Sequence, residues 1–333
     1  MKTIQAPFEP VLDIRCHLGE GPLYEKATDT LHFLDIERSQ VHHLELETMR
    51  HSIDYYEGHP SCIRLRDGSK EPGFIAAVDR GFAFLPLRSP SSTSSNPSPL
   101  NSYHTLLPAS THPLTKMHNE GETDPLGRFM AGTKPARGEP MEGKEEEVLW
   151  RIEGGKEGGR GDDVERMIEG MGLPNGMGWS RDGKTLFVTD SAKCEITRSD
   201  FSLTTGKISN TRLFASSPRS SPTGLSSSFP DGLCVDAYDK VYSAHFGGSK
   251  IVRYSPSGEP DLTIEFKDAL HITACELGGK EGQTLFVTTA SLEESGDGDK
   301  DELRERFAQS GAVWAVDLGG EETLAKERYK FKG

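Results

Sequence analysis

The chain has 333 residues, of which 34% are hydrophobic and 27% charged, and its formal net charge is −14. This composition is typical of a globular protein, and the negative charge argues against nucleic acid or an anionic membrane as a partner. No apolar stretch at the start suits a signal peptide, and no run of about 18 apolar residues occurs in the sequence. We therefore expect a cytoplasmic protein.

A pair of short apolar strands joined by a tight turn recurs along the chain. In chain order the copies are "TLHFLDIERSQVHHLELET", "PGFIAAVDRGFAFLPL", "GRFMAGTKP" with "EEEVLWRIEGG", "KTLFVTDSAKCEITRSDFSLTTG", "DKVYSAHFGGSKIVRYSPSG", and "QTLFVTTASLEES" with "GAVWAVDLGG". Six such units, repeating roughly every 40 to 60 residues in β-rich sequence, are typical of a propeller. We predict an all-β protein, a six-bladed β-propeller, because a sandwich would not repeat one hairpin six times.

Low-complexity segments interrupt the repeats. They are rich in Ser and Pro or in Gly and Glu, which cannot bury enough apolar surface to fold alone, so we expect surface loops. The predicted insertions lie near residues 88–110, 136–163, 216–228 and 291–307 of a single domain that spans 1–333. The five cysteines are scattered and form no C-x-x-C pair, so buried free thiols are expected.

Ring closure is expected to involve both ends of the sequence. The stretches "PFEPVLDIR" (7–15) and "KERYKFK" (326–332) each suit a strand, and pairing them in one shared blade would remove the exposed edges of the array.

Four Gly-rich turns each place one polar residue beside a glycine. They are "LGEGP", "MHNEGETDPLGR", "LPNGMGWS" and "FPDGLCVD", with Glu20, Asn119, Asn175 and Asp231 as the polar residues. Taken singly, each turn has a local explanation, because Asn-Gly and Asp-Gly pairs favour tight turns.

Taken together, the four turns predict a metal site. The first strand of each propeller blade lines the central channel, and the "PNG" and "PDG" turns precede their strands by similar offsets, so these positions should face one another. The carboxylates of Glu20 and Asp231 with the amide oxygen of Asn175 make an all-oxygen, dianionic site, which suits one hard divalent cation. Ca²⁺ is the first choice, and Zn²⁺, Mn²⁺ or Mg²⁺ would also fit.

The same motifs resemble those of the regucalcin (senescence marker protein) and gluconolactonase family. "LGEGPLYEKATDTLHFLDIERSQVHHLELET" resembles the opening blade of that family. "NEGETDPLGRFMAGT", "LPNGMGWSRDGKTLFVTDS" and "FPDGLCVDAYDKVYSAHFGGSKIVRYSPSG" resemble its three central signatures. The resemblance covers nearly the whole chain. It implies a six-bladed propeller that hydrolyses sugar lactones with one divalent metal at the mouth of its channel.

The resemblance also implies roles for individual residues. Glu20, Asn175 and Asp231 would be the metal ligands, with Asp231 also the general base that activates water. Asn119 would contact the substrate or the metal-bound water, and Asp190 would lie near that water. We therefore predict a lactonase in which the metal polarises the lactone carbonyl. No Ser-His-Asp constellation or G-x-S-x-G elbow supports a covalent serine hydrolase.

The chain departs from the family around Asn119. Many members carry an arginine two residues earlier that binds substrate hydroxyls, whereas this chain has Met117 with Lys116 beside it. We expect Met117 and Lys116 to contact the substrate in its place. Arg137, in the altered segment "KPARGEP", is a candidate to reach the pocket from the other side. His245 is a further candidate for substrate binding, although a lone histidine in a blade strand also suits packing.

Two other functions stay open at this point. One is a metal-dependent hydrolase of a non-sugar lactone or ester, which the loss of the arginine favours. The other is a non-catalytic, calcium-binding regulatory propeller. If the protein is an enzyme, its partner is expected to be a small lactone or ester, with neither nucleic acid nor membrane involved. We expect a monomer or a homodimer.

Overall fold

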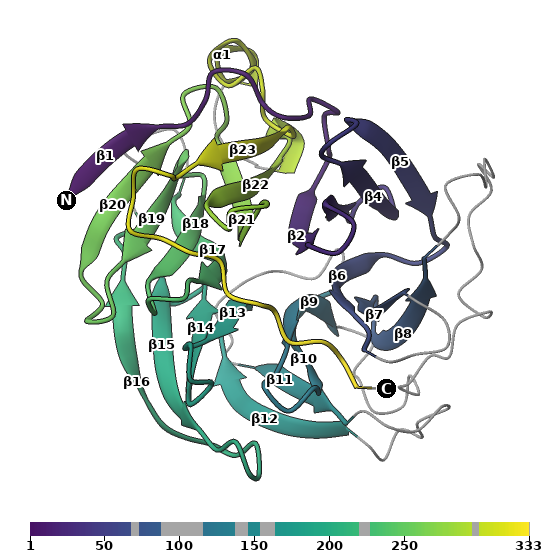
Figure 1. Ribbon diagram of the computed structural model, residues 1–333, viewed down its shortest axis with the longest axis vertical. Coiled ribbons are helices and arrows are strands. Elements are labelled where there is room, and N and C mark those ends of the chain that lie inside the picture. The colour runs from purple at the N-terminus through teal and green to yellow at the C-terminus, as the bar shows by residue number, and fades with distance from the viewer. Residues whose placement is uncertain are drawn as a thin grey trace.

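Six sheets radiate from a central channel in the computed structural model, which describes residues 1–67, 73–87, 116–136, 146–153, 164–219, 227–294 and 300–332 (Figure 1). This arrangement confirms the predicted six-bladed β-propeller. Across those ranges no helix is long and apolar enough to cross a membrane.

Each blade begins with a strand at the channel. These inner strands are β2 (Gly19–Glu25), β6 (Pro60–Leu65), β9 (Lys116–Thr123), β13 (Pro174–Trp179), β17 (Phe229–Val235) and β21 (His271–Gly278). The other strands of blades 1 and 2 are β3 (Thr30–Asp35), β4 (Gln40–Glu45), β5 (Arg50–Tyr55), β7 (Gly73–Val78) and β8 (Gly81–Pro86). Blades 3 and 4 add β10 (Phe129–Pro135), β11 (Glu147–Ile152), β12 (Val164–Met171), β14 (Thr185–Asp190), β15 (Glu195–Phe201) and β16 (Ile208–Ser216). Blades 5 and 6 add β18 (Val241–Phe246), β19 (Lys250–Tyr254), β20 (Pro260–Glu265), β22 (Thr284–Ala290) and β23 (Val313–Asp317).

The hydrophobic core is divided among the six interfaces between neighbouring blades. Blade 2 illustrates why its strands read as continuous apolar runs: Phe74 and Ala76 pack toward blade 1, whereas Ile75 and Ala77 pack toward blade 3. Separate clusters fill the interfaces between blades 3 and 4, 4 and 5, 5 and 6, and 6 and 1. Because both faces of a blade are buried, alternation of apolar and polar residues is lost. The predicted buried, free thiols are confirmed for all five cysteines.

A β-bulge interrupts the inner strands near their beginnings. In β13, Pro174 pairs with Asp190 but Met177 pairs with Val188, so the inner strand has one extra residue. Blades 1 and 5 show the same shift, between Glu20 and Leu23 and between Pro230 and Leu233. The "PNG" and "PDG" segments predicted as turns are therefore bulged parts of strands. A bulge redirects side chains, and bulges are common beside active sites.

The ring closes differently from the prediction of a shared blade. Strand β1 (Lys2–Gln5) pairs in parallel with β20 of blade 5, and Leu12 forms a bridge to Val313 of blade 6. The stretch 326–332 joins neither sheet and crosses the face of the propeller (Figure 1). Its residue Phe331 forms an isolated β-bridge with Arg66 of blade 2. Its cations meet buried carboxylates there, which accounts for the difference.

The insertions are only partly described by the structure. Residues 88–110 lie outside the described ranges, and β11 lies within 136–163. The expected loop at 291–307 contains the short helices η2 (Leu292–Glu294) and α1 (Lys300–Arg306). Helix α1 has acidic residues in its first turn and basic residues in its last, which suits the helix dipole. Leu303 and Phe307 are buried against Leu270, a packing that the charged sequence does not indicate.

The close approach of neighbouring inner strands predicts that Gly176→Ala is strongly destabilising. A Cβ at Gly176 would lie less than 3.0 Å from the backbone of Gly232 and Leu233, which cannot move aside like a flexible side chain. We expect the free energy of unfolding to fall by about 1–3 kcal/mol, as for overpacked cores, measured by urea denaturation. Gly320→Ala is the matched control, because no atom lies within 4 Å of its added Cβ. Equal stability of the two variants would contradict this account.

Candidate active site

The structure brings three of the predicted residues together at one mouth of the channel. Glu20, Asn175 and Asp231 lie at the second or third position of β2, β13 and β17, so they share the end where the inner strands begin. Asn175 Nδ2 donates hydrogen bonds to Asp231 Oδ1 and to Ser191 Oγ, the latter at 3.2 Å. Asn175 and Asp231 are each 5% exposed, so the site lies below the molecular surface.

A third carboxylate, Glu120 of β9, belongs to this group and was missed in the sequence. Burial, with added repulsion from Glu20, raises its pKa to about 8. Burial also raises the pKa of Glu20 and of Asp231 well above their ordinary values, with added repulsion from Asp231 and from Glu120 respectively. The three carboxyl groups therefore share one electrostatic environment. We call them, together with Asn175, the acidic cluster.

The bulge in β9 explains why Glu120 was overlooked. His118 pairs with Thr133 and Gly121 with Ala131, so Asn119 and Glu120 stand opposite one residue. Simple alternation along a strand would direct only one of two consecutive residues to the site. The adjacent "NEG" sequence was the available signal.

Lys134 of β10 is the second residue that sequence reasoning missed. Its positive charge lowers the pKa of both Glu20 and Asp231, opposing the larger effects of burial and like charge. It is paired across the strands with Met117. A cation that influences two carboxylates of the acidic cluster is placed to affect an anionic ligand there as well.

Asn119 links three blades at this mouth. Its Nδ2 donates to the carbonyl oxygen of Pro174 in blade 4 at 3.1 Å, and its own carbonyl oxygen accepts from Ser61 Oγ of blade 2 at 2.7 Å. Its role toward substrate or water stays a prediction. The hydrogen bonds show that it also fixes the entry of β13, one residue before Asn175.

The other proposed substrate-binding residues are placed as follows. Met117 is buried, and the ammonium group of Lys116 forms an ion pair with Glu147 of β11. His245 is buried, and burial and nearby Lys250 lower its pKa to about 3, so it is uncharged at neutral pH. Arg137 lies outside the described residues. Substrate contacts of all four stay predictions.

Asp190 orients the chain that enters the site. Its Oδ2 and Oδ1 accept hydrogen bonds from the backbone N–H groups of Gly172 and Leu173, each at 2.9 Å. Asp35 of blade 1 does the same for His17 and Leu18, just before β2. Asp190 therefore positions the segment that leads to Asn175, and its predicted place near a metal-bound water stays a prediction.

The acidic cluster suits a cation, although no metal site is shown. Within the described ranges, no group of three or more His, Cys, Asp or Glu side chains is arranged to hold a metal ion. Yet Glu120 Oε2 is buried and has no hydrogen-bond partner among the described residues. Buried carboxylates that raise one another's pKa lack compensating charge, which a divalent cation on oxygen ligands supplies. The donor chemistry therefore fits the predicted metal.

Fold and site together define a six-bladed propeller with an acidic channel mouth. The chain belongs to the SMP-30/gluconolactonase/LRE-like family, whose model matches residues 18–291. This confirms the resemblance read from the motifs.

Three similar proteins illustrate the relationship. Regucalcin from Bos taurus is 28% identical over 287 residues, which are 85% of this chain and 86% of that protein. The structure of a regucalcin from Agrobacterium tumefaciens, described as a calcium-binding protein, matches with a TM-score of 0.79 and 18% identity, covering 100% of this chain and 99% of its own. A gluconolactonase structure from Xanthomonas campestris matches with a TM-score of 0.62 and 18% identity over 93% and 88% of the two chains. The two structures support the fold.

The raised pKa of Glu120 predicts how the stability of metal-stripped protein depends on pH. A folded-state pKa of about 8, against an ordinary value of 4.5, means that the folded protein holds a proton that the unfolded chain releases over that interval. The stabilisation is thus complete below about pH 4.5 and is lost as pH rises toward about 8. We expect the free energy of unfolding, measured with chelator present, to fall over this interval. Glu120→Gln should show a shallower fall, and identical slopes would contradict the assignment.

Proposed function

We propose that this protein is a metal-dependent lactonase that hydrolyses a sugar lactone to the corresponding acid. The observation that carries the proposal is the convergence of Glu20, Asn175 and Asp231 with buried Glu120 at one channel mouth. Family membership suggests lactone hydrolysis, and a gluconolactonase is among the proteins with this fold.

Glu20, Asn175 and Asp231 would hold one divalent ion, with Ca²⁺ the first choice because all the ligands are oxygens. One relative, the Agrobacterium tumefaciens regucalcin, is described as calcium-binding. The amide nitrogen of Asn175 now faces Asp231. Rotation of the amide by a half-turn would place the amide oxygen on that side, where it could bind the ion. When bound, the ion supplies a Lewis acid for the lactone carbonyl and its developing negative charge.

The chain's own residues supply the proton transfer. Asp231 takes a proton from water as the water oxygen bonds to the lactone carbonyl carbon. The bond from this carbon to the ring oxygen then breaks, and the proton passes to the departing oxygen to give the hydroxy acid. A carboxylate within hydrogen-bond reach of the attacking water can act as such a base.

Asn119 and Lys134 complete the substrate side of the site in this proposal. Asn119 orients the substrate from β9, where its amide already holds the entry of blade 4. Lys134 contributes positive charge near the acidic cluster, which favours the carboxylate that forms on ring opening.

The proposed function predicts that lactone hydrolysis requires both a divalent ion and the predicted ligands. Metal-stripped protein is refilled with Ca²⁺, Zn²⁺, Mn²⁺ or Mg²⁺ and assayed on five- and six-membered aldonolactones. We expect Asp231→Ala and Asn175→Ala each to lower kcat/KM by about 100-fold or more, since each removes a group that acts in the transition state. Asp301→Ala, on the exposed face of α1, is the control and should keep full activity.

If no lactone is hydrolysed although calorimetry shows tight metal binding, the enzyme hypothesis is rejected and a calcium-binding regulatory propeller is favoured. Turnover of non-sugar lactones or esters alone would reject the sugar substrate but keep the hydrolase.

Met117 provides a separate test of substrate class. A methionine cannot donate hydrogen bonds to sugar hydroxyls, and this one is buried on β9 opposite Lys134. We expect Met117→Arg to raise kcat/KM for polyhydroxylated lactones relative to an unsubstituted lactone by about 10-fold, which corresponds to roughly 1.4 kcal/mol of added hydrogen bonding. Met117→Leu, of similar volume, is the control. An unchanged ratio in Met117→Arg would show that this position does not contact substrate hydroxyls.

A further inference from the structure

Residues 319–332, which we call the strap, cross the propeller face opposite the acidic cluster. The strap contacts Trp179 at the end of β13, Leu65 at the end of β6, and Glu276 near the end of β21. Glu20, Asn175 and Asp231 lie where the inner strands begin. The strap therefore covers the other mouth of the channel, and Figure 1 shows it running across the centre of this face.

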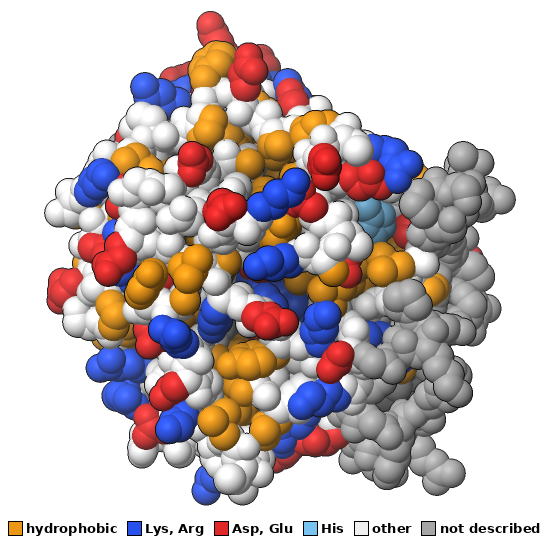
Figure 2. Space-filling model, viewed as in Figure 1, with side chains coloured by type: hydrophobic (Ala, Val, Ile, Leu, Met, Phe, Trp, Pro, Cys, Tyr) orange, Lys and Arg blue, Asp and Glu red, His pale blue; other side chains and the backbone are white. Residues whose placement is uncertain are grey.

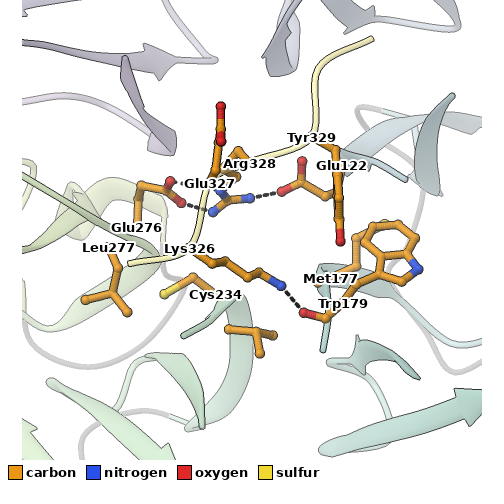
Figure 3. Close-up of a pocket in the computed structure, with 12 residues that line it drawn as sticks. Glu122, Met177, Trp179, Cys234, Glu276, Leu277, Lys326, Glu327, Arg328 and Tyr329 are labelled. Atoms are coloured by element: carbon orange, nitrogen blue, oxygen red, sulfur yellow. Dashed lines mark hydrogen bonds and ion pairs between the residues drawn. The ribbon is translucent and has the colours of Figure 1, made fainter. Parts of the chain in front are cut away.

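Arg328 bridges two blades that face each other across the channel. Its guanidinium forms ion pairs with Glu122 of blade 3 and Glu276 of blade 6, including a 2.8 Å hydrogen bond from Nε to Glu276 Oε1 (Figure 3). Blades 3 and 6 are three positions apart in a ring of six. A side chain that pairs with both must therefore lie close to the channel axis.

Neighbouring strap residues hold Arg328 in this position. Lys326 Nζ donates to the carbonyl oxygen of Trp179 in blade 4 (Figure 3). The Phe331 N–H donates to Leu65 O at 2.9 Å, and its ring is buried in the core between blades 2 and 3. The strap is thus fixed on both sides of the guanidinium.

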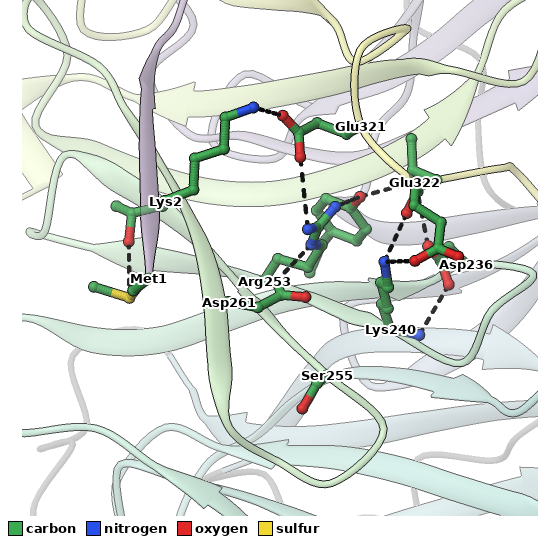
Figure 4. Close-up of polar contacts among 12 residues, drawn as sticks. Met1, Lys2, Asp236, Lys240, Arg253, Ser255, Asp261, Glu321 and Glu322 are labelled. Atoms are coloured by element: carbon green, nitrogen blue, oxygen red, sulfur yellow. Dashed lines mark hydrogen bonds and ion pairs between the residues drawn. The ribbon is translucent and has the colours of Figure 1, made fainter.

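The beginning of the strap is anchored to blade 5. Glu321 forms ion pairs with Arg253 and with Lys2 of β1, and Lys240 Nζ donates to Glu322 Oε2 at 2.9 Å (Figure 4). Tyr242 donates to Thr323 Oγ1 at 2.8 Å. These contacts direct the following residues toward the centre of the face.

Two cavities meet at Arg328. A recess of about 490 Å³ lies beside the strap, and a small pocket of about 20 Å³ is lined by Cys234. Lys326, Arg328 and Glu276 line both pockets, so the strap lies where the two adjoin. The smaller pocket has room for about one water molecule. Figure 2 shows Lys and Arg side chains gathered at the centre of this face.

Stability alone does not account for burying these cations. Burial lowers the pKa of Lys326 to about 8 and lowers that of Arg328 well below its usual value, so both positive charges are costly there. A buried ion pair often contributes little net stability compared with apolar residues of similar size. An apolar strap could cover the face, but it would leave Glu122 and Glu276 without Arg328.

We propose that the strap is a stopper that seals the mouth of the channel at which the inner strands end, with Arg328 as its central side chain. We call this opening the strand-end mouth. The acidic cluster then communicates with solvent through the other mouth alone. Water and solutes are excluded from the strand-end half of the channel and from the small pocket that Cys234 lines.

The experiment measures labelling of Cys234 by a maleimide in the full chain, with peptide mass spectrometry to resolve each cysteine. Cys234 is 4% exposed and lines the small pocket together with Arg328 and Glu276, whereas Cys16 and Cys62 are buried elsewhere and serve as internal references. The variants are Arg328→Gln, which removes the central cation, and Lys326→Met, which removes the bond to Trp179. Arg166→Gln, an exposed arginine on outer strand β12, is the matched control.

We expect Cys234 to be labelled at least 10-fold faster in Arg328→Gln and Lys326→Met, with Cys16 and Cys62 unchanged and Arg166→Gln like wild type. Protection of Cys234 in both variants would overturn the proposal. If Arg328→Gln unfolds and exposes all cysteines alike, Lys326→Met decides by the same criterion. If labelling of all cysteines became faster by the same factor in both variants, the strap would only stabilise the fold, and the stopper proposal would be overturned.

Discussion

The packing of inner strands against one another around the channel is the constraint on which the site depends. Gly176 lies against the backbone of Gly232, and Gly232 in turn lies against Ala274, so blades 4, 5 and 6 meet almost backbone to backbone. Neither Gly176 nor Gly232 has a positive φ, so space rather than conformation requires glycine there. Asn175 and Asp231 each precede one of these glycines and are drawn together by the contact. The glycine beside each polar residue thus sets how closely polar side chains from different blades approach.

The propeller and most of the acidic cluster could be predicted because both follow from repetition. Equivalent offsets in successive units place Asn175 and Asp231 at equivalent points of a ring, and no side-chain detail is needed. The local state of these segments was predicted wrongly, since Asn-Gly and Asp-Gly have a familiar meaning as turns. The actual reason for glycine lies in the neighbouring blade. A pattern within one unit cannot reveal that contact.

Glu120 and the strap were beyond prediction for different physical reasons. Glu120 faces the site because β9 bulges against β10, and the register of a bulge depends on pairing with a second strand. The stretch 326–332 alternates charged and aromatic residues like an edge strand, so a shared blade was the natural expectation. Its path is decided instead by Glu122 and Glu276, which are buried far away in sequence and which both form ion pairs with Arg328. Long-range charge compensation leaves no periodic signal in the strap itself.

Buried carboxylates lie at both mouths of the channel, but their negative charge is compensated differently at each. At the strand-end mouth, Glu122 and Glu276 are paired by guanidinium groups from Arg64 and Arg328, so the chain supplies its own cations. At the other mouth, Glu20, Glu120 and Asp231 raise one another's pKa. Lys134 near Glu20 and Asp231, and Arg64 and Arg328 near Glu120, offset only part of that repulsion. Buried carboxylates without full charge compensation are costly. The imbalance is intelligible if a cation from solution completes the second mouth, since the carboxylates must then remain available to bind it. A sealed strand-end mouth fits the same logic, because it leaves a single route by which ion, water and substrate reach one set of ligands.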